Sequence, residues 1–207
     1  MNTMFRSLKA EEVKVRVNTI NEKFCTLLLY KDSRCDMAVL DEAVSPLRWQ
    51  RKHYECKGNL YCSVGIKCDD GTWVFKDDCG TEGYAEKEKS EASDSFKRAC
   101  TNWGIGRELY TAPLMKVKSD LCGVYENDKG KYSTNAFFNV YEYEVTDGVI
   151  TKLSVHIEYW AKGADGKLGL VTNVVPFKCH KPPVKDEVDT GKGFYGSLGD
   201  VKIDSKN

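Results

Sequence analysis

The stretch SEASDSFKRACTNWGIGRELY, residues 90–110, decides the fold of this chain. On a helix its apolar residues step by four, three and four positions and form one stripe, Ala92, Phe96, Ala99 and Trp103. Lys97 and Arg98 follow Phe96 directly, so at about 100° per residue they point away from the stripe. Gly104 and Gly106 then interrupt the helical pattern. The stretch predicts a packed helix with two adjacent cations facing outward, which by itself also describes an ordinary amphipathic helix.

The residues before this helix alternate in the way strands do. Residues 13–30 contain two such runs around a turn at residues 21–23, which predicts a β-hairpin. Residues 37–44 have helical spacing and stop before Pro46. Three further strands are expected at residues 47–56, 60–66 and 73–77, with the hairpin signal DDGT before the last. We therefore expect an α+β fold, an antiparallel sheet and hairpin of β-β-β-α type packed on a long helix.

The ends of the chain and its second half are less regular. A short helix is expected around Phe5 and Leu8, and residues 115–135 are interpreted as a long loop. Residues 138–145 and 149–159 flank a Thr-Asp-Gly turn, and residues 168–177 favour one more strand. The expected division is a core at 1–113, a β-rich extension or small second domain at 114–179, and a flexible tail at 180–207.

Composition limits the possible functions. The chain has 207 residues, 41% hydrophobic and 30% charged, with a formal net charge of +0. A nucleic-acid site must therefore arise from local segregation of charge, not from overall basicity. One candidate is residues 47–56, where Arg48, Arg51 and Lys52 alternate with aromatic residues. Such a mixture suits binding of a single strand, but it also fits an edge strand with a basic face.

The nine cysteines are odd in number and irregular in spacing, which favours reduced thiols over disulfides. Cys62 and Cys100 fit small buried positions. The spacing of Cys56, Cys62 and Cys68 does not suit zinc. No apolar run approaches the ~20 residues of a membrane span, and no signal-peptide core is present, so a cytoplasmic protein is expected.

Two enzymatic alternatives depend on short patterns. Asp41, Glu55 and Lys57 match an acid followed by Glu-x-Lys, which in a Mg²⁺-dependent nuclease would hold the metal and orient water. Cys56 and His53 are three residues apart on an expected strand, so their side chains should lie on opposite faces. This placement argues against a catalytic pair of a cysteine nucleophile and a histidine base. No GxxxxGK[ST] motif is present, so no ATP and no other cofactor is expected.

The strings SFKRACTNWGIGRELYTAP and EKEKSEASD give the chain a wider resemblance. From about residue 8 to residue 113 it resembles the Rad-fifty-two family of single-strand annealing proteins, above all the short phage and prophage members. The resemblance implies that Lys97 and Arg98 line the floor of a DNA groove and that Arg16, Tyr30 and Lys31 belong to its hairpin wall. Thr101 stands where the family has a further arginine, for which Arg107 is a possible substitute.

The candidate DNA-binding set combines this resemblance with the basic stretches, and no catalytic or metal-binding residue is expected. Its members are Lys97, Arg98, Arg16, Tyr30, Lys31, Arg34, Arg48, Arg51 and Lys52. The resemblance further implies a non-enzymatic, homo-oligomeric ring that anneals single-stranded DNA in recombination in a bacterial cell. A phage exonuclease and a host single-strand-binding protein are possible partners. A binding module for single-stranded DNA or RNA that does not anneal is the other alternative.

Overall fold

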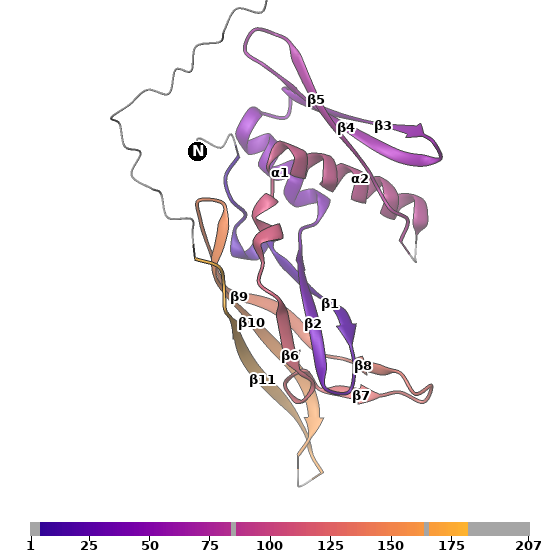
Figure 1. Cartoon of the computed structure of the whole chain (residues 1–207), viewed down its shortest axis with the longest axis vertical. Helices are drawn as coiled ribbons and strands as arrows, with labels where there is room; N and C mark the ends of the chain where they lie inside the picture. The colour runs from indigo at the N-terminus through magenta and orange to yellow at the C-terminus, as the bar shows by residue number, and fades with distance from the viewer. Residues whose placement is uncertain (1–4, 84–85, 164–165, 182–207) are drawn as a thin grey trace, which may run out of the picture.

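The computed structural model describes residues 5–83, 86–163 and 166–181 (Figure 1). Within them the chain is an α+β protein with antiparallel sheets and two α-helices, α1 (Ser33–Val44) and α2 (Lys87–Trp103). The strands of the first half are β1 (Lys14–Ile20), β2 (Phe24–Tyr30), β3 (Trp49–Cys56), β4 (Asn59–Lys67) and β5 (Trp73–Cys79). Those of the second half are β6 (Met115–Lys118), β7 (Val124–Glu126), β8 (Tyr132–Thr134), β9 (Phe137–Thr146), β10 (Val149–Lys162) and β11 (Leu168–Phe177).

Six strands form a curled half-barrel in the order β11-β10-β9-β1-β2-β6, in the lower part of Figure 1. The predicted hairpins of β1 with β2 and of β9 with β10 are confirmed, as is β11. The prediction of a long loop at residues 115–135 is wrong. Met115 and Val117 are buried residues of the strand β6, which pairs with β2, and the strand β7 pairs with β8. Strands from residues 1–113 and 114–179 thus share one sheet.

Local turn chemistry fixes these hairpins. Between β1 and β2, the Asn21 side-chain oxygen accepts from the backbone N–H of Lys23 and of Phe24, each at 2.9 Å. Between β9 and β10, Asp147 and Gly148 have φ of 50° and 78°. Two successive positive values match a type I′ turn, which suits the twist of paired strands.

The half-barrel curls around a hydrophobic core of its own. Its fully buried members come from the middle strands and from β6 and the turn behind it, and they include Cys25, Met115, Cys122, Val155 and Ile157. Alternate residues of β10 contribute Leu153, Val155 and Ile157 to this core, each at most 2% exposed.

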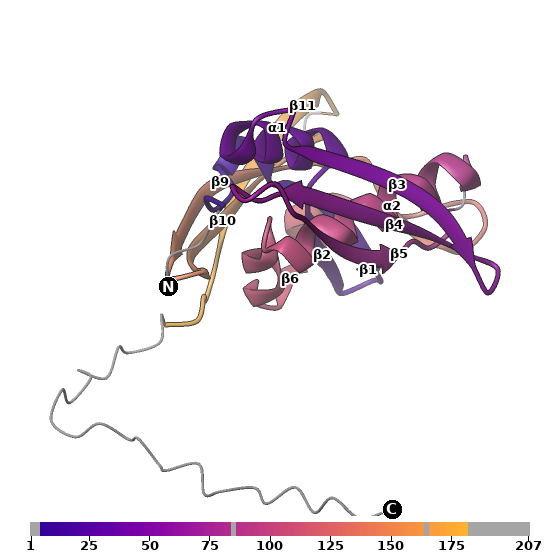
Figure 2. The ribbon, with the colours of Figure 1, turned by 90° about the horizontal axis from the view of Figure 1, so that it is seen from above.

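The other layer is a three-stranded sheet, β3-β4-β5, which packs on α2 (Figure 2). The predicted apolar stripe of α2 faces this sheet: Phe96 and Ala99 are fully buried, and Phe96 stacks on Trp49 at 6.1 Å between ring centroids. Trp103 donates to the Val64 carbonyl oxygen at 2.9 Å. The long helix packed under a sheet is therefore present as predicted.

The first residues of the described chain differ from expectation. Phe5 and Leu8 are buried in the core beneath α1 and α2, but the segment is not a helix around them. Only a short 3-10 turn, η1 (Ala10–Glu12), is helical. The Leu8 N–H donates to Glu108 at 2.7 Å, so a tertiary partner replaces the helical hydrogen bond. Most of the expected tail, residues 182–207, lies outside the described residues.

All nine cysteines are free, as expected, and Cys62 and Cys100 are buried. Across the described ranges, no group of three or more His, Cys, Asp or Glu side chains is arranged to hold a metal ion. Neither of the α-helices in the described part of the chain is long and apolar enough to cross a membrane.

Candidate nucleic-acid interface

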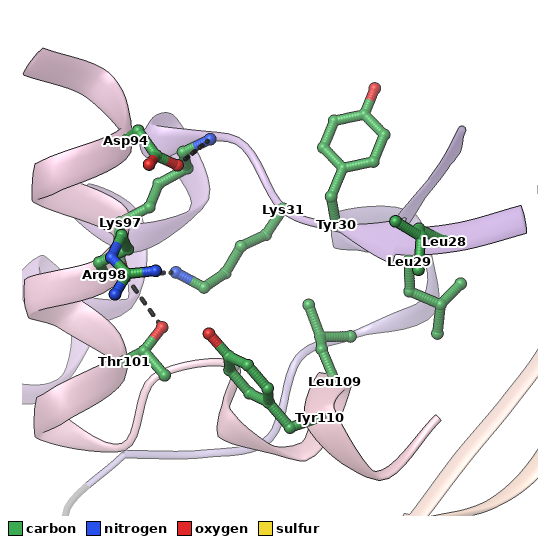
Figure 3. A pocket seen from close by; sticks show the side chains of 11 residues that line it. Leu28, Leu29, Tyr30, Lys31, Asp94, Lys97, Arg98, Thr101, Leu109 and Tyr110 are labelled. Atoms are coloured by element: carbon green, nitrogen blue, oxygen red, sulfur yellow. Dashed lines mark hydrogen bonds and ion pairs between the residues drawn. The ribbon is translucent and has the colours of Figure 1, made fainter. Parts of the chain in front are cut away.

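A cavity of about 300 Å³ lies between the end of β2 and the outward side of α2 (Figure 3). The 3-10 turn η2 (Arg107–Thr111) closes a further side of it. These three elements and Lys31, the residue directly after β2, line the cavity with Tyr30, Lys97, Arg98, Thr101 and Tyr110. Four residues that sequence placed in two distant segments, two on the hairpin and two on the helix, thus line one cavity.

Lys97 and Arg98 make contacts that leave them accessible. The Lys97 ammonium lies 3.9 Å from the Asp94 carboxylate, and its side chain is 29% exposed. The Arg98 Nε lies 3.1 Å from the Asp78 carboxylate, and its side chain is 46% exposed. Ion pairs of this exposure contribute about 0–1 kcal/mol, because water and salt screen them. A phosphate can therefore replace either carboxylate at little cost.

Lys31 differs from these two cations. Its side chain reaches toward α2 (Figure 3) and is 6% exposed, paired with Asp36, which is fully buried. It also donates to the Lys97 carbonyl oxygen at 3.4 Å. Burial raises the pKa of Asp36 to about 6 against the attraction of Lys31. Lys31 therefore forms part of the cavity floor, with its charge already compensated inside the protein.

The position of Lys31 depends on a glycine. Gly106 has φ +68°, and a Cβ built there would lie 2.5 Å from Lys31 Cε and 3.3 Å from a Leu8 methyl group. Any side chain would meet the lysine stem that passes over this residue. The close approach of η2 to the end of β2 therefore requires a glycine at this point.

The hairpin contributes an exposed cation beside the cavity. The guanidinium of Arg16 lies 5.9 Å from the centroid of the Tyr30 ring, within the range of a cation–π contact. Arg16 on β1 is exposed, and Leu28, its cross-strand partner on β2, lines the cavity. Arg16 and Tyr30, which the family resemblance assigned to one hairpin wall, thus lie together.

The other candidate cations lie elsewhere. Arg34, in the first turn of α1, is 81% exposed and pairs with Asp32 at 3.3 Å. Strand alternation divides the basic stretch of β3, since Arg51 faces α2, 4.6 Å above the Phe96 ring, while Lys52 points to the opposite face. Arg48 pairs with Asp69 at 2.7 Å. Among the described contacts, none places these four residues in the cavity.

The residues of the nuclease alternative are not brought together. Asp41 accepts a hydrogen bond from Trp49 Nε1 at 2.6 Å, at the start of β3. Glu55 lies at the other end of that strand, roughly 20 Å away at ~3.3 Å per residue. His53 contacts the Ala92 carbonyl oxygen at 3.1 Å, on the face toward α2, whereas Cys56 belongs to the opposite face. Neither enzymatic pattern forms a site.

Sequence reasoning missed Tyr110, which lines the cavity and is 75% exposed. The signal for it was an aromatic residue four positions after the Gly-x-Gly break, in the short turn that follows α2. Arg107, the possible substitute for a missing arginine, instead donates to the Thr101 and Asn102 carbonyl oxygens at 3.1 and 3.0 Å. It caps the C-terminal end of α2.

In chemical terms the cavity offers two accessible cations and two tyrosines around a neutralised floor. Such a combination suits an anionic, partly apolar ligand, since cations attract phosphates and aromatic faces contact sugars and bases. No family model, no curated protein and no solved structure matches this chain. Function must therefore be inferred from the residues of the site.

Proposed function

We propose that this protein binds single-stranded DNA along the cavity of Lys97 and Arg98 and anneals complementary strands without ATP. The observation that carries the proposal is the convergence of Tyr30, at the end of β2, and Lys31, which follows it, with Lys97 and Arg98 of α2 on one surface cavity. The resemblance of residues 8–113 to the Rad-fifty-two family leads to the same assignment for these residues.

The mechanism needs electrostatics and no covalent step. Two complementary strands repel each other through their phosphates, and bound cations reduce that repulsion and release counterions. Lys97 and Arg98 exchange their carboxylate partners for phosphates, so the backbone faces the protein and the base edges face outward. A second strand can then test its register, and stacking supplies about 1.4 kcal/mol per step once pairing begins.

The proposal includes assembly of several copies. A cavity of about 300 Å³ is small compared with a strand of useful length, so one protomer provides only a short part of a binding track. A closed homo-oligomer would join such parts into a continuous path. Measuring the particle mass with and without single-stranded DNA tests this, and a protein that stays monomeric in both states would contradict it.

The decisive test replaces Lys97 and Arg98 by alanine and follows single-strand affinity against salt. Each lost phosphate contact lowers the slope of log K against log[salt] by about 0.7, so the double variant should lose about 1.4. The matched control is Lys87→Ala with Lys89→Ala, which removes the same charge from the exposed first turn of α2. An unchanged slope in the Lys97 and Arg98 variant would remove the cavity from the DNA path.

Two assays separate the remaining alternatives. Mixing complementary oligonucleotides with the protein, without nucleotide, should accelerate duplex formation, whereas a plain single-strand binder coats the strands and leaves that rate unchanged or slower. Incubating a labelled single strand with Mg²⁺ should leave it intact, and shortened products would favour the nuclease alternative.

A further inference from the structure

The open face of the three-stranded sheet is a second surface with its own chemistry. Cross-strand pairing puts Lys52, Tyr54, Tyr61, Lys67, Trp73 and Phe75 on the face that points away from α2. The opposite face carries the side chains that pack against the helix, among them Trp49, Val64 and Asp78. In the view of Figure 2, β3, β4 and β5 lie over α2 and no other helix or strand covers them.

Four aromatic rings on this face form two stacks. Tyr54 and Tyr61 lie 5.5 Å apart between centroids with an interplanar angle of 20°, and Trp73 and Phe75 lie 6.2 Å apart at 24°. Tyr54, Trp73 and Phe75 are 37%, 36% and 49% exposed. Large aromatic residues with this exposure, gathered on one sheet face, are typical of a binding surface.

The sheet is shaped to hold one ring close to its backbone. At Gly65 a Cβ would lie 2.4 Å from the Phe75 ring, so the ring covers the place where a side chain would stand. On β4, the middle strand, only Ser63 and Gly65 lie on this face between the two stacks, and both are small residues. The stacks are roughly 13 Å apart along β4, the length of four residues at ~3.3 Å each, which leaves room for separate flat groups.

Charge on the face favours an anionic ligand. Lys52 is two residues from Tyr54 on β3, and Lys67 is the cross-strand partner of Trp73, so each stack has an adjacent lysine. Both lysines are exposed, and neither makes an ion pair within the described residues. Asp77, an acidic residue on the same face, accepts a hydrogen bond from the Tyr54 hydroxyl at 2.9 Å.

We infer that this aromatic face, Tyr54–Tyr61 with Trp73–Phe75, is a second nucleic-acid site that stacks the bases of a single strand while Lys52 and Lys67 contact its phosphates. Aromatic side chains on an open sheet bind unpaired bases in this manner, and every base offers a flat face to them. The inference does not require the Lys97 cavity, because it concerns bases on the other side of the sheet.

The test compares oligodeoxythymidine with an abasic oligonucleotide of equal length. The test variant is Tyr54→Leu with Trp73→Leu, and the control is Tyr141→Leu with Trp160→Leu, each 62% exposed on the other sheet. Base stacking on one aromatic is worth about 1–3 kcal/mol, so the test variant should bind oligodeoxythymidine at least about tenfold more weakly. Its affinity for the abasic strand should remain that of the unmodified protein, and the control should change neither.

Three results would overturn the inference. The first is an unchanged affinity of the test variant for oligodeoxythymidine, and the second is an equal loss of affinity for both strands. The third is a test variant whose particle mass falls while its affinity stays the same, which would make the face a contact between copies. Far-ultraviolet circular dichroism checks folding, and if the double variant unfolds, Phe75→Leu alone tests the second stack. The Lys97 and Arg98 variant should weaken the abasic strand too, so failure of the cavity proposal and failure of this inference give different patterns.

Discussion

The two sheets of this protein bury one face each by different means. The three-stranded sheet is covered by α2, whose largest buried side chain, Phe96, fills the space between them. The six-stranded sheet curls and closes its core with its own strands and the short segments around β6. A sheet covered on one face by a helix leaves its second face open, whereas a curled sheet uses its curvature to enclose residues. The difference explains why the candidate binding surfaces gather around α2 and the three-stranded sheet.

The largest effect should come from emptying the helix-covered core. Phe96→Ala removes a fully buried ring that stacks on Trp49 and lies under Arg51, and should cost about 3–5 kcal/mol of unfolding free energy. Ile157→Ala in the curled core should cost about 2–5 kcal/mol. Denaturant unfolding followed by circular dichroism measures both. A single shifted transition in each variant indicates one cooperative unit, while two transitions would show that the sheets unfold separately.

A somewhat smaller effect is expected at the junction of the two layers, where β2 ends. Lys31→Met leaves Asp36 buried without its cation, which should cost about 3 kcal/mol at pH 7. Because the folded-state pKa of Asp36 is already raised to about 6, protonation relieves this variant, and its deficit should shrink as pH falls toward 5. Adding Asp36→Leu should restore most of the stability. A double variant as unstable as Lys31→Met would contradict this account.

The smallest effect concerns Asp32, which caps α1 and pairs with Lys14 of β1 at 2.8 Å. Hydrogen bonding to Lys14, outweighing partial burial, lowers the pKa of Asp32 to about 2. The stability from its charge is therefore present above about pH 4 and lost as pH falls through about 2. Asp32→Asn should cost less than about 1 kcal/mol at pH 7, and this cost should disappear below about pH 2, measured by urea unfolding. Lys14→Met should show the same pH dependence, and a deficit independent of pH would exclude this ion pair as its cause.

Most elements of the flat layer could be predicted because their signals are local. The stripe of α2, the DDGT turn and the alternation of β4 depend on residues a few positions apart. The strand β6 has the same alternation, with Met115 and Val117 buried, but four residues are too few to stand out from an irregular stretch. Phe5 and Leu8 have helical spacing by chance, and tertiary burial decides their conformation.

The site could be predicted only in part. Lys97 and Arg98 face outward because helical periodicity fixes them against Phe96. Lys31 follows the expected hairpin directly, and its position in the sequence suggested an exposed cation. Its ammonium is instead buried against Asp36, and the turn from β2 into α1 creates this contact. Arg51 and Lys52 were expected to act together, but strand alternation divides them between two faces, and the gathering of aromatic residues from three strands on one open face depends on the register.

Gly106 is a position where we expect few substitutions to be tolerated. A position without a side chain, away from any catalytic chemistry, should rank among the least replaceable in a library of single substitutions. Even alanine would be strained at φ +68° and would require the Lys31 stem to shift, which disturbs the contact of its ammonium with Asp36. Variants at this position should therefore resemble Lys31 variants in a deep mutational scan, although the two residues are far apart in the chain.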